Sequence, residues 1–373
     1  MSTKLVVDAL ALLSPLTGIG RYTSEVTSNI KKNEEFDITL YYGYYSKEIL
    51  STATINKSKV KKLKNIVAKT PLLKKFARKA INVYSKYYMY NKEFDIYWQP
   101  NFIPNMNIKA KNVVTSVHDF SFMLYKDFHP KERIEFFNKY FFNNIQRSDI
   151  ILTGSHFTKE EILKYIKIDH SKVEVIYHGI RHDIFRKYDC HNITLDLPAK
   201  FLLCVGSLEP RKNLIRLLKA YELLPNELKE EYHLVLIGFS GWENLEILQL
   251  INKNKKYINY LGFVSDEELA MVYNMATIFI YPSLYEGFGL PPIEAMACGV
   301  PVITSSNTSM EEICMDNVVY VNPYDIEDIK NKIELLLLDD IYRNDISIKG
   351  ILHAQQFTWE QSALKHSQVF NMF

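Results

Sequence analysis

Two glutamates, Glu286 and Glu294, flank a glycine- and proline-rich run that could bind a phosphate group. The run follows an apolar, strand-like segment from Ile278 to Tyr281, and it opens a helix-like segment whose first turn contains Pro291 and Pro292. Proline is tolerated there because the first backbone N–H groups of a helix have no partner within the helix. Those free N–H groups and the helix dipole favour an anion such as a diphosphate. A turn with two solvated glutamates would show the same local pattern.

A basic pair follows another strand-like segment, Phe201 to Val205. Arg211 and Lys212 stand just before a helix-like segment that runs from Leu214 to Leu223. Arginine can hold a phosphate through two parallel hydrogen bonds, and lysine acts as a point charge. Most such pairs are solvated helix starts. The pair by itself therefore fits a diphosphate site or an ordinary surface.

Two weaker signals lie in the N-terminal half. His118 ends the strand-like segment from Asn112 to Val117, where a histidine is either structural or exposed at the rim of a cleft. Gly18 and Gly20 are expected to form a turn before a helix that begins at Tyr22. A bare G-x-G sequence is weak support for a binding loop.

The elements that must position these residues alternate along the whole chain. Short β-branched runs, including one expected strand from Asp37 to Tyr45, alternate with helical patterns, which is typical of a parallel sheet covered on both faces. The pattern lapses between Asp183 and Leu197 and then restarts. A chain of 373 residues exceeds one ordinary core. We therefore predict two doubly wound α/β domains, 1–185 and 198–355, and a terminal helix in 356–373, with ligands at the carboxyl ends of the strands.

The run from Tyr281 to Ile303 resembles the E-x7-E region of retaining glycosyltransferase family 4. This resemblance implies a GT-B fold, in which two Rossmann-like domains face a cleft, with the terminal helix returning to the N-terminal domain. It implies that Glu286 faces the donor sugar and that Glu294 holds the ribose hydroxyls. The backbone between them would meet the diphosphate at Gly287, Phe288, Gly289 and Leu290.

The same resemblance extends to the other elements. It implies that Arg211 and Lys212 neutralise the donor diphosphate, the more so because Ser207 stands where many relatives carry arginine. His118 would line the reaction centre. Two further donor-binding positions are Gly20, at the phosphate and acceptor, and Val264, near the base. Ser155 and Ser265 each fit either a helix cap or a ligand contact.

The implied reaction is a retaining sugar transfer from a nucleotide-sugar donor to a glycan or polyprenyl-diphosphate-linked acceptor, with no metal. Likeness to bacterial mannosyltransferases of O-antigen and capsule assembly favours GDP-mannose as the donor. Other GDP-, UDP- or dTDP-sugars fit the same motifs. A nucleotide-sugar epimerase or an inactive GT-B module that binds glycan are the competing classes, and the paired glutamates argue against both.

A strongly basic stretch interrupts the N-terminal half. Between Asn56 and Lys92 there are twelve lysines and arginines and no acidic residue, although the net charge of the chain is only +2. Interleaved apolar residues predict basic amphipathic helices that could contact an anionic membrane. A solvated basic face explains the pattern equally well, and no motif supports nucleic-acid binding. Without a signal peptide, a transmembrane run or C-x-x-C spacing, we expect a cytoplasmic protein that could lie peripherally on the inner membrane face.

Overall fold

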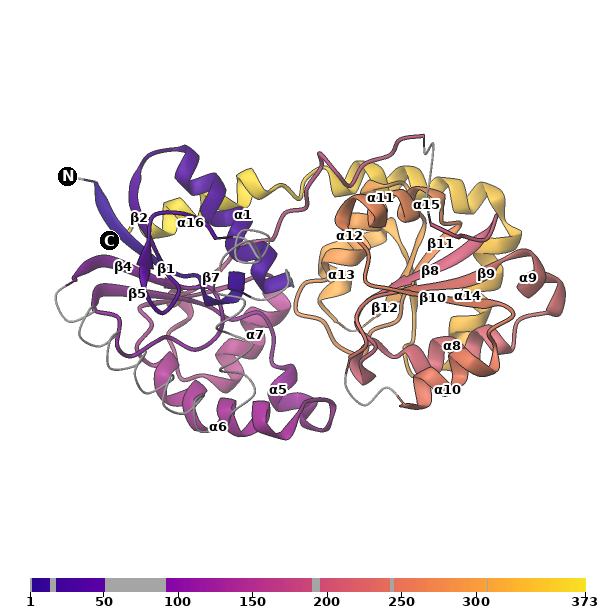
Figure 1. The fold of residues 1–373 in the computed structure, drawn as a ribbon, viewed down its shortest axis with the longest axis horizontal. Coiled ribbons are helices and arrows are strands. Elements are labelled where there is room, and N and C mark those ends of the chain that lie inside the picture. Colours follow the sequence, from indigo (N-terminus) through magenta and orange to yellow (C-terminus); the bar gives the residue numbers. More distant parts are fainter. Residues whose placement is uncertain (1, 14–17, 51–91, 190–194, 242–244, 307) are drawn as a thin grey trace, which may run out of the picture.

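The computed structural model describes residues 2–13, 18–50, 92–189, 195–241, 245–306 and 308–373. These residues form two α/β units that lie side by side, each built around its own sheet (Figure 1). The first sheet has the strand order β3-β2-β1-β4-β5-β6-β7, and the second has the order β10-β9-β8-β11-β12-β13. Neighbouring strands are parallel except for the pair of β2 and β3. The expected pair of doubly wound α/β units is confirmed.

The first unit contains short strands whose apolar residues are largely buried: β1 (Thr3–Asp8), β2 (Phe36–Tyr41), β3 (Tyr45–Ser46), β4 (Phe94–Gln99), β5 (Ala110–Ser116), β6 (Ile150–Thr153) and β7 (Val173–Val175). Its helices are α1 (Gly18–Lys32), α5 (Ser121–Leu124), α6 (Lys131–Ile145) and α7 (His156–Tyr165). Short 3-10 helices are η1 (Leu10–Leu13), η2 (Lys126–Phe128) and η3 (His170–Lys172).

The second unit repeats this pattern with the strands β8 (Phe201–Val205), β9 (His233–Ile237), β10 (Ile258–Gly262), β11 (Ile278–Tyr281), β12 (Val302–Ser305) and β13 (Val319–Val321). Its helices are α8 (Leu214–Glu222), α9 (Asn226–Glu231), α10 (Leu245–Lys253), α11 (Asp266–Met275), α12 (Leu290–Ala297), α13 (Ser309–Cys314), α14 (Ile326–Leu338) and α15 (Asp340–Ala354). Short 3-10 helices are η4 (Pro210–Lys212) and η5 (Met315–Asn317).

Two local predictions were wrong. The segment from Asp37 to Tyr45 is not one strand, because Gly43 has a φ of +86° and turns the chain so that β3 pairs antiparallel with β2. Gly18 and Gly20 do not form a turn either: α1 begins at Gly18, and Gly20 is buried within it. A glycine outside the left-handed region can occupy a helix, at a modest entropic cost.

Each sheet has one topological switch point, where consecutive segments of the chain are added on opposite sides of the first strand. The chain runs outward from β1 to β2 on one side and then returns to place β4 on the other side of β1. The second sheet does the same, with β8 and β11 adjacent at its centre. In open α/β sheets, ligands bind beyond the carboxyl ends of the strands at such switch points. The topology therefore marks one candidate binding position in each unit.

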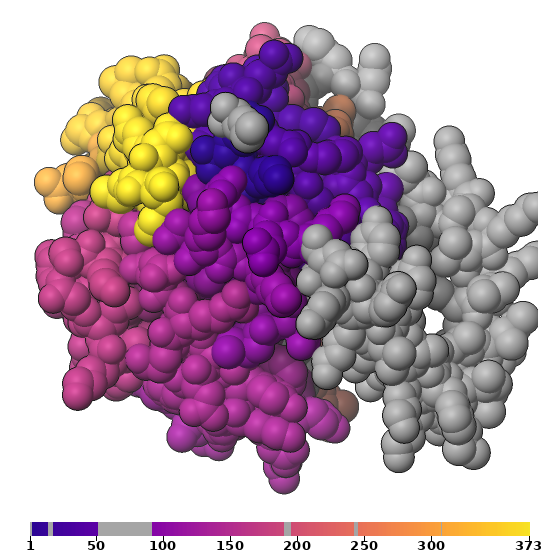
Figure 2. Space-filling model, turned by 90° about the vertical axis from the view of Figure 1, so that its left-hand side faces the viewer, coloured from indigo at the N-terminus to yellow at the C-terminus, as the bar shows by residue number. Residues whose placement is uncertain are grey.

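The last helix, α16 (Trp359–Phe370), leaves the second unit and packs against α1 of the first (Figure 2). A buried hydrogen-bond chain joins the two helices. The Tyr22 hydroxyl contacts Ser116 Oγ at 2.9 Å and His366 Nε2 at 2.7 Å, and His366 Nδ1 contacts the Ser362 carbonyl at 2.7 Å. Because a carbonyl only accepts, Nδ1 carries the proton and Nε2 accepts from Tyr22. A neutral His366 thus fastens the end of the chain to the first unit.

Replacing His366 by glutamine is expected to make the stability of the folded protein depend less on pH in the acid range. Burial lowers the pKa of His366 to about 4, whereas an unfolded histidine titrates near pH 6.5. Between these pH values the folded protein binds fewer protons than the unfolded chain, so its stability falls as the pH drops from about 6.5 to about 4, by roughly 3 kcal/mol at most. Glutamine keeps an acceptor for Tyr22 and cannot titrate.

The measurement is the melting temperature of both proteins across this pH range. Burial also lowers the pKa values of His118 and His178, and both proteins retain these two rings. The difference between the two curves therefore reports the titration of His366 together with its electrostatic effect on the pKa of His178. Parallel curves would show that this ring is protonated in the folded protein.

Three further expectations concern single side chains or segments. Ser155 and Ser265 are N-caps, and Ser265 forms a capping box with Glu268. Cys204, Cys298 and Cys314 are buried and form no disulfide with one another, whereas Cys190 and nearly all of the basic stretch from 56 to 92 lie outside the described residues. Within the described part of the chain, no helix is both long and apolar enough to span a membrane.

Candidate active site

A cleft of about 440 Å³ opens between the two units, at the carboxyl ends of β8 and β11. Every predicted site residue except Gly20 lines this cleft; the others are His118, Ser207, Arg211, Lys212, Val264, Glu286, Gly287, Phe288, Gly289, Leu290 and Glu294. Gly20 is buried within α1 and does not line the cleft. The cleft is lined there by its neighbours Gly18, Ile19 and Arg21. The cleft therefore unites segments that are far apart in the sequence.

Glu286 is the anion around which the cations of the cleft are arranged. The residue is only 8% exposed, which excludes the solvated alternative. Glu286 Oε2 lies 2.9 Å from Arg211 Nη1, and Glu286 Oε1 lies 2.7 Å from Lys212 Nζ. Tyr281 donates its hydroxyl to the same Oε1 at 3.0 Å. Burial opposes ionisation of Glu286, but the two cations outweigh it and lower the pKa of the carboxyl to about 2.

Arg211 and Lys212 place two cations in the cleft. Both side chains are nearly buried, so they are not a solvated helix start. Glu286 pairs with both of them, and Glu209 and Asp119, which also line the cleft, add negative charge near Arg211. Burial lowers the pKa of Lys212, which Glu286 opposes, and among the described residues the buried Arg211 Nε has no hydrogen-bond partner. A buried donor without a partner is expected to find one in a ligand. This part of the cleft suits an anion.

The chain backbone approaches the cleft closely at several glycines. Gly289 is the N-cap of α12 and has a φ of +97°, a conformation that glycine adopts without strain. The start of α12 lines the cleft at Leu290 and Pro291; of the first three residues of this helix only Leu290 has a backbone N–H, because Pro291 and Pro292 have none. Gly206 follows β8 with a φ of +157°, and a Cβ atom added at Gly238 would lie 1.9 Å from the Gly206 carbonyl oxygen. Both loops are too tight for larger residues.

Comparison with known proteins identifies the family of the chain. The model described as Glycosyltransferase Family 4 matches residues 17–184, and the model described as Glycosyl transferases group 1 matches residues 191–353. O-antigen chain mannosyltransferase B of Escherichia coli is 32% identical over 370 residues, which cover 96% of each chain. The chain belongs to glycosyltransferase family 4.

Solved structures show the same fold as this glycosyltransferase. Sucrose-phosphate synthase from Thermosynechococcus elongatus has a TM-score of 0.75 at 19% identity, covering 100% of this chain and 99% of that one. HepE of Anabaena, solved in complex with UDP-glucose, has a TM-score of 0.69 at 14% identity and full coverage of both chains. The expected GT-B architecture is confirmed.

Glu294 of the glycosyltransferase, which the resemblance assigns to the ribose, is engaged in an ion pair with Arg21. The carboxylate is 3% exposed, and its Oε1 accepts a hydrogen bond of 2.6 Å from Arg21 Nη1. Arg21 Nη2 also donates to Asp266 Oδ1 at 2.6 Å, and Asp266 pairs with Arg181. Burial raises the pKa of Glu294, and Arg21 opposes that effect. The two units are therefore joined by an ion pair at the ribose position that the resemblance implies.

His118 of the glycosyltransferase lies in the cleft as a neutral ring. Its Nε2 donates to the Pro100 carbonyl at 2.8 Å, and burial lowers its pKa. His178, which the sequence interpretation did not include, lines the cleft 5.8 Å away between ring centroids. Within the part of the chain that is described, His178 Nδ1 is buried without a hydrogen-bond partner. Both the structural and the functional interpretation of His118 fit, since the ring is anchored and exposed to the cleft.

Glu209 of the glycosyltransferase also lines the cleft, and the sequence interpretation did not include it. It accepts a hydrogen bond from Ser207 Oγ. Phe239 and Phe263 lie in the loops after β9 and β10, which the resemblance places near the nucleotide base. Their rings are stacked in the cleft, with centroids 4.5 Å apart and an interplanar angle of 17°. Both rings are exposed, as a platform for a flat ligand would be.

The expectation of metal-free chemistry stays a prediction. Among the described residues, no group of three or more histidine, cysteine, aspartate or glutamate side chains is arranged to hold a metal ion. The cationic groups near the expected diphosphate are those of Arg211 and Lys212.

Proposed function

We propose that this glycosyltransferase moves mannose, with retention of configuration, from GDP-mannose to a glycan acceptor in the assembly of an O-antigen-type polysaccharide. The observation that carries the proposal is the 32% identity to an O-antigen chain mannosyltransferase over nearly the full length of both proteins. The residues of the cleft supply the groups that such a transfer requires. The choice of mannose rests on that relative, and GDP is the nucleotide that the sequence resemblance favours.

The cleft can accommodate the donor in one direction. The base would stack on the exposed pair of Phe239 and Phe263, near Val264. The diphosphate would lie between the backbone at Gly289 and Leu290 and the cations Arg211 and Lys212. The sugar would then reach the part of the cleft that contains Glu286 and His118. Such a pose places the negative charge of the diphosphate beside two fixed cations.

The chemical step would break the bond between the sugar C1 and the oxygen of the β-phosphate. The acceptor hydroxyl oxygen forms the new bond to C1, and its proton passes to the departing phosphate oxygen, so that the products are the glycoside and the nucleoside diphosphate. Charge develops on that phosphate as the bond breaks. Arg211, Lys212 and the Leu290 amide at the start of α12 are preorganised to stabilise it. Glu286 holds both cations in position while its remaining acceptor capacity faces the sugar.

Donor binding must also rearrange the contact between the units at Glu294. If its carboxylate receives the ribose hydroxyls, these share it with Arg21 or replace Arg21 there. Arg21 keeps a partner in either case, because Asp266 accepts from its other Nη. Donor binding is therefore expected to change how tightly the two units are held together.

The experiment is a panel of GDP-mannose, UDP-glucose, UDP-galactose and dTDP-rhamnose measured by thermal shift and by turnover. A ligand that binds only the folded protein raises the melting temperature, by an amount set by its concentration relative to Kd. We expect GDP-mannose to give the largest shift and to release GDP. NMR of the product would give the configuration of the new bond.

Each outcome has a defined meaning. Stabilisation and turnover with another sugar nucleotide would replace mannose while retaining the enzyme class. Binding without turnover toward any acceptor would favour an inactive glycan-binding module. Stabilisation by none of the four would contradict the position assigned to the donor.

A further inference from the structure

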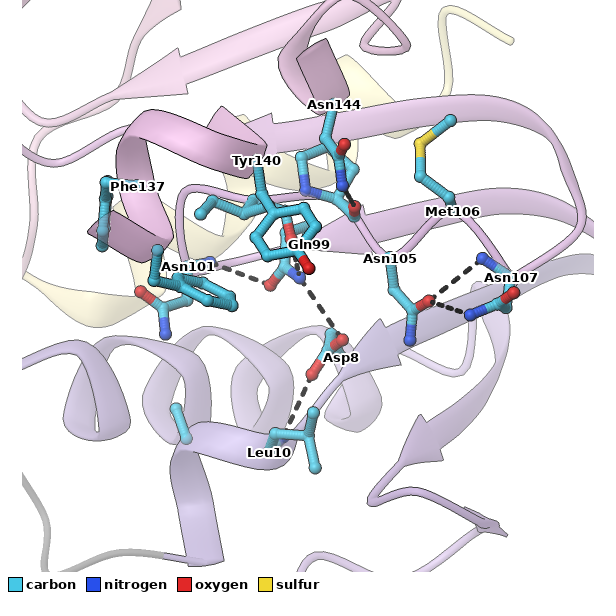
Figure 3. Close-up of a pocket in the computed structure, with 14 residues that line it drawn as sticks. Asp8, Leu10, Gln99, Asn101, Asn105, Met106, Asn107, Phe137, Tyr140 and Asn144 are labelled. Atoms are coloured by element: carbon cyan, nitrogen blue, oxygen red, sulfur yellow. Dashed lines mark hydrogen bonds between the residues drawn. The ribbon is translucent and has the colours of Figure 1, made fainter. Parts of the chain in front are cut away.

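A second pocket, of about 550 Å³, lies entirely in the first unit (Figure 3). Its walls come from the end of β1, from η1, from the loop that connects β4 to β5, and from α6. It shares no lining residue with the donor cleft. None of the reaction chemistry described above uses it.

The pocket occupies the switch point of the first sheet. Asp8 is the last residue of β1, Gln99 is the last residue of β4, and these two strands are adjacent. In the second sheet the same position, between β8 and β11, is the donor cleft. Since ligands of open α/β sheets bind at this position, the first sheet has a ligand site of its own here.

The polar side chains at the base of the pocket are held in fixed orientations. Gln99 Nε2 donates to the Ile103 carbonyl at 2.8 Å, and Gln99 Oε1 accepts from the Asn101 amide at 3.1 Å, so Gln99 shapes the loop that follows it. Asp8 Oδ1 accepts from the Leu10 amide at 3.2 Å, and its Oδ2 accepts from Gln99 at 3.3 Å. An ionised carboxylate offers about four acceptor positions. A ligand hydroxyl can therefore still donate to Asp8.

The charge of the described lining disfavours anionic ligands. Among the residues that the structure describes, Asp8 is the one charged side chain that lines the pocket, and no lysine, arginine or histidine of that part of the chain lines it. The other polar groups are amides and a phenol, contributed by Gln99, Asn101, Asn105, Asn107, Asn144 and Tyr140. Burial raises the pKa of Asp8 to about 6, so the carboxyl is mainly ionised at pH 7. A phosphate would be repelled, whereas a neutral ligand rich in hydroxyl groups would be matched.

Aromatic side chains of α6 cover the opposite wall. Tyr140 extends from the helix over the polar base of the pocket (Figure 3), and its ring lies 5.0 Å from that of Phe136. Both rings are partly exposed. A ring with a polar tip suits a ligand that has both an apolar face and hydroxyl edges, as a pyranose does.

The pocket adjoins the reaction cleft through one short stretch of backbone. The Pro100 carbonyl accepts the hydrogen bond from His118, which lines the cleft, and the next residue, Asn101, lines the pocket. A ligand that spans several sugar units could thus extend from one site to the other.

We propose that the pocket at the carboxyl ends of β1 and β4 binds a neutral sugar residue of the acceptor glycan, adjacent to the residue that receives the new sugar. This proposal rests on the proposed function, because it assumes a saccharide acceptor. It makes Asp8, Asn101 and Tyr140 determinants of acceptor recognition, with no part in donor binding. The diphosphate of a lipid-linked acceptor would lie elsewhere.

The test compares two exposed aromatic residues of α6. Tyr140 and Phe142 are each 37% exposed, but only Tyr140 lines the pocket. With an α-linked mannotriose as the acceptor, Tyr140→Ala is expected to raise the acceptor KM about five- to tenfold, the effect of losing one aromatic contact. The KM for the donor should not change. Phe142→Ala should retain both values.

Two measurements separate this proposal from the proposed function. Hydrolysis of GDP-mannose without acceptor reports on the donor cleft alone, and its absence from the wild-type protein would count against the proposed function. Titration of mannotriose by calorimetry reports on the pocket alone, without any donor. Binding that Tyr140→Ala weakens and Phe142→Ala does not supports the site. No binding to the wild-type protein, or equal effects of the two substitutions, overturns it even when donor hydrolysis is normal.

Discussion

Lys212→Met is expected to lower kcat for sugar transfer by about 10²- to 10³-fold, the usual cost of losing one preorganised group that stabilises transition-state charge. Methionine retains the length of the side chain and removes its charge. Arg211 still pairs with Glu286 at 2.9 Å, so the buried carboxylate keeps a counterion and the fold should persist. One of the two cations beside the expected diphosphate is thereby lost. The measurement is kcat and donor KM at saturating acceptor.

Lys219→Met is the matched control for this substitution. Lys219 is a lysine of α8, the helix that follows the Arg211–Lys212 loop, but its side chain is half exposed and lies 3.6 Å from Glu246, outside the cleft. Exposed pairs of this kind contribute little to stability, and wild-type turnover is expected. Near-normal turnover by Lys212→Met would assign the stabilisation of the leaving phosphate to Arg211 and the Leu290 amide. Circular dichroism of both variants distinguishes lost catalysis from lost folding.

The local sequence sufficed for the parts of the site that lie within one strand–loop–helix segment. The loop after β8 and the run from Glu286 to Glu294 carry their own signals, namely glycine, proline and charge at a helix start. Each signal reflects a physical requirement of that segment alone, such as unpaired amides at the first turn of a helix. The alternation of strands and helices likewise predicted two sheets of parallel strands.

Contacts between distant segments could not be predicted in this way. Arg21 pairs with Glu294 across 273 positions of sequence, and His366 meets Tyr22 across 344. Nothing in the composition of either segment specifies its partner, since an arginine in a first helical turn or a histidine in a last helix is unremarkable alone. The G-x-G pattern predicts a loop, and a loop would place Gly20 rather than Arg21 at the ligand. The helix that forms there turns Gly20 inward and presents Arg21 to the other unit.

Gly287 lies in the interface between the two units, where there is no room for a side chain. A Cβ atom at this position would lie 1.8 Å from the His118 carbonyl oxygen and 3.0 Å from Asp119 Cβ. The Gly287 carbonyl is fixed as well, because it accepts from Ser155 Oγ at 2.7 Å and from Thr158 Oγ1 at 3.2 Å. The sequence interpretation assigned Gly287 to a close approach of the ligand. The same residue also allows the backbone at His118 of the first unit to pack against the loop that carries Glu286.

Gly287→Ala is consequently expected to lower kcat/KM by about 10²-fold or more. A backbone carbonyl cannot yield as a flexible side chain can, so either the loop that carries Glu286 shifts by about 1 Å or the two units separate, and a displacement of this size at a reacting centre has that cost. The added methyl group is also expected to reduce the free energy of unfolding by about 1–3 kcal/mol. Activity and melting temperature are measured together.

Ser155→Ala is the comparison, since it removes a donor to the same Gly287 carbonyl without adding an atom. It should cost about 1–2 kcal/mol of stability, because the hydroxyl also caps α7, and less than tenfold in kcat/KM. Small-angle scattering then distinguishes the two ways in which Gly287→Ala can fail, because only separation of the units enlarges the radius of gyration. Full activity in Gly287→Ala would show that sugar transfer takes place with the units farther apart than the contact between Gly287 and His118 allows.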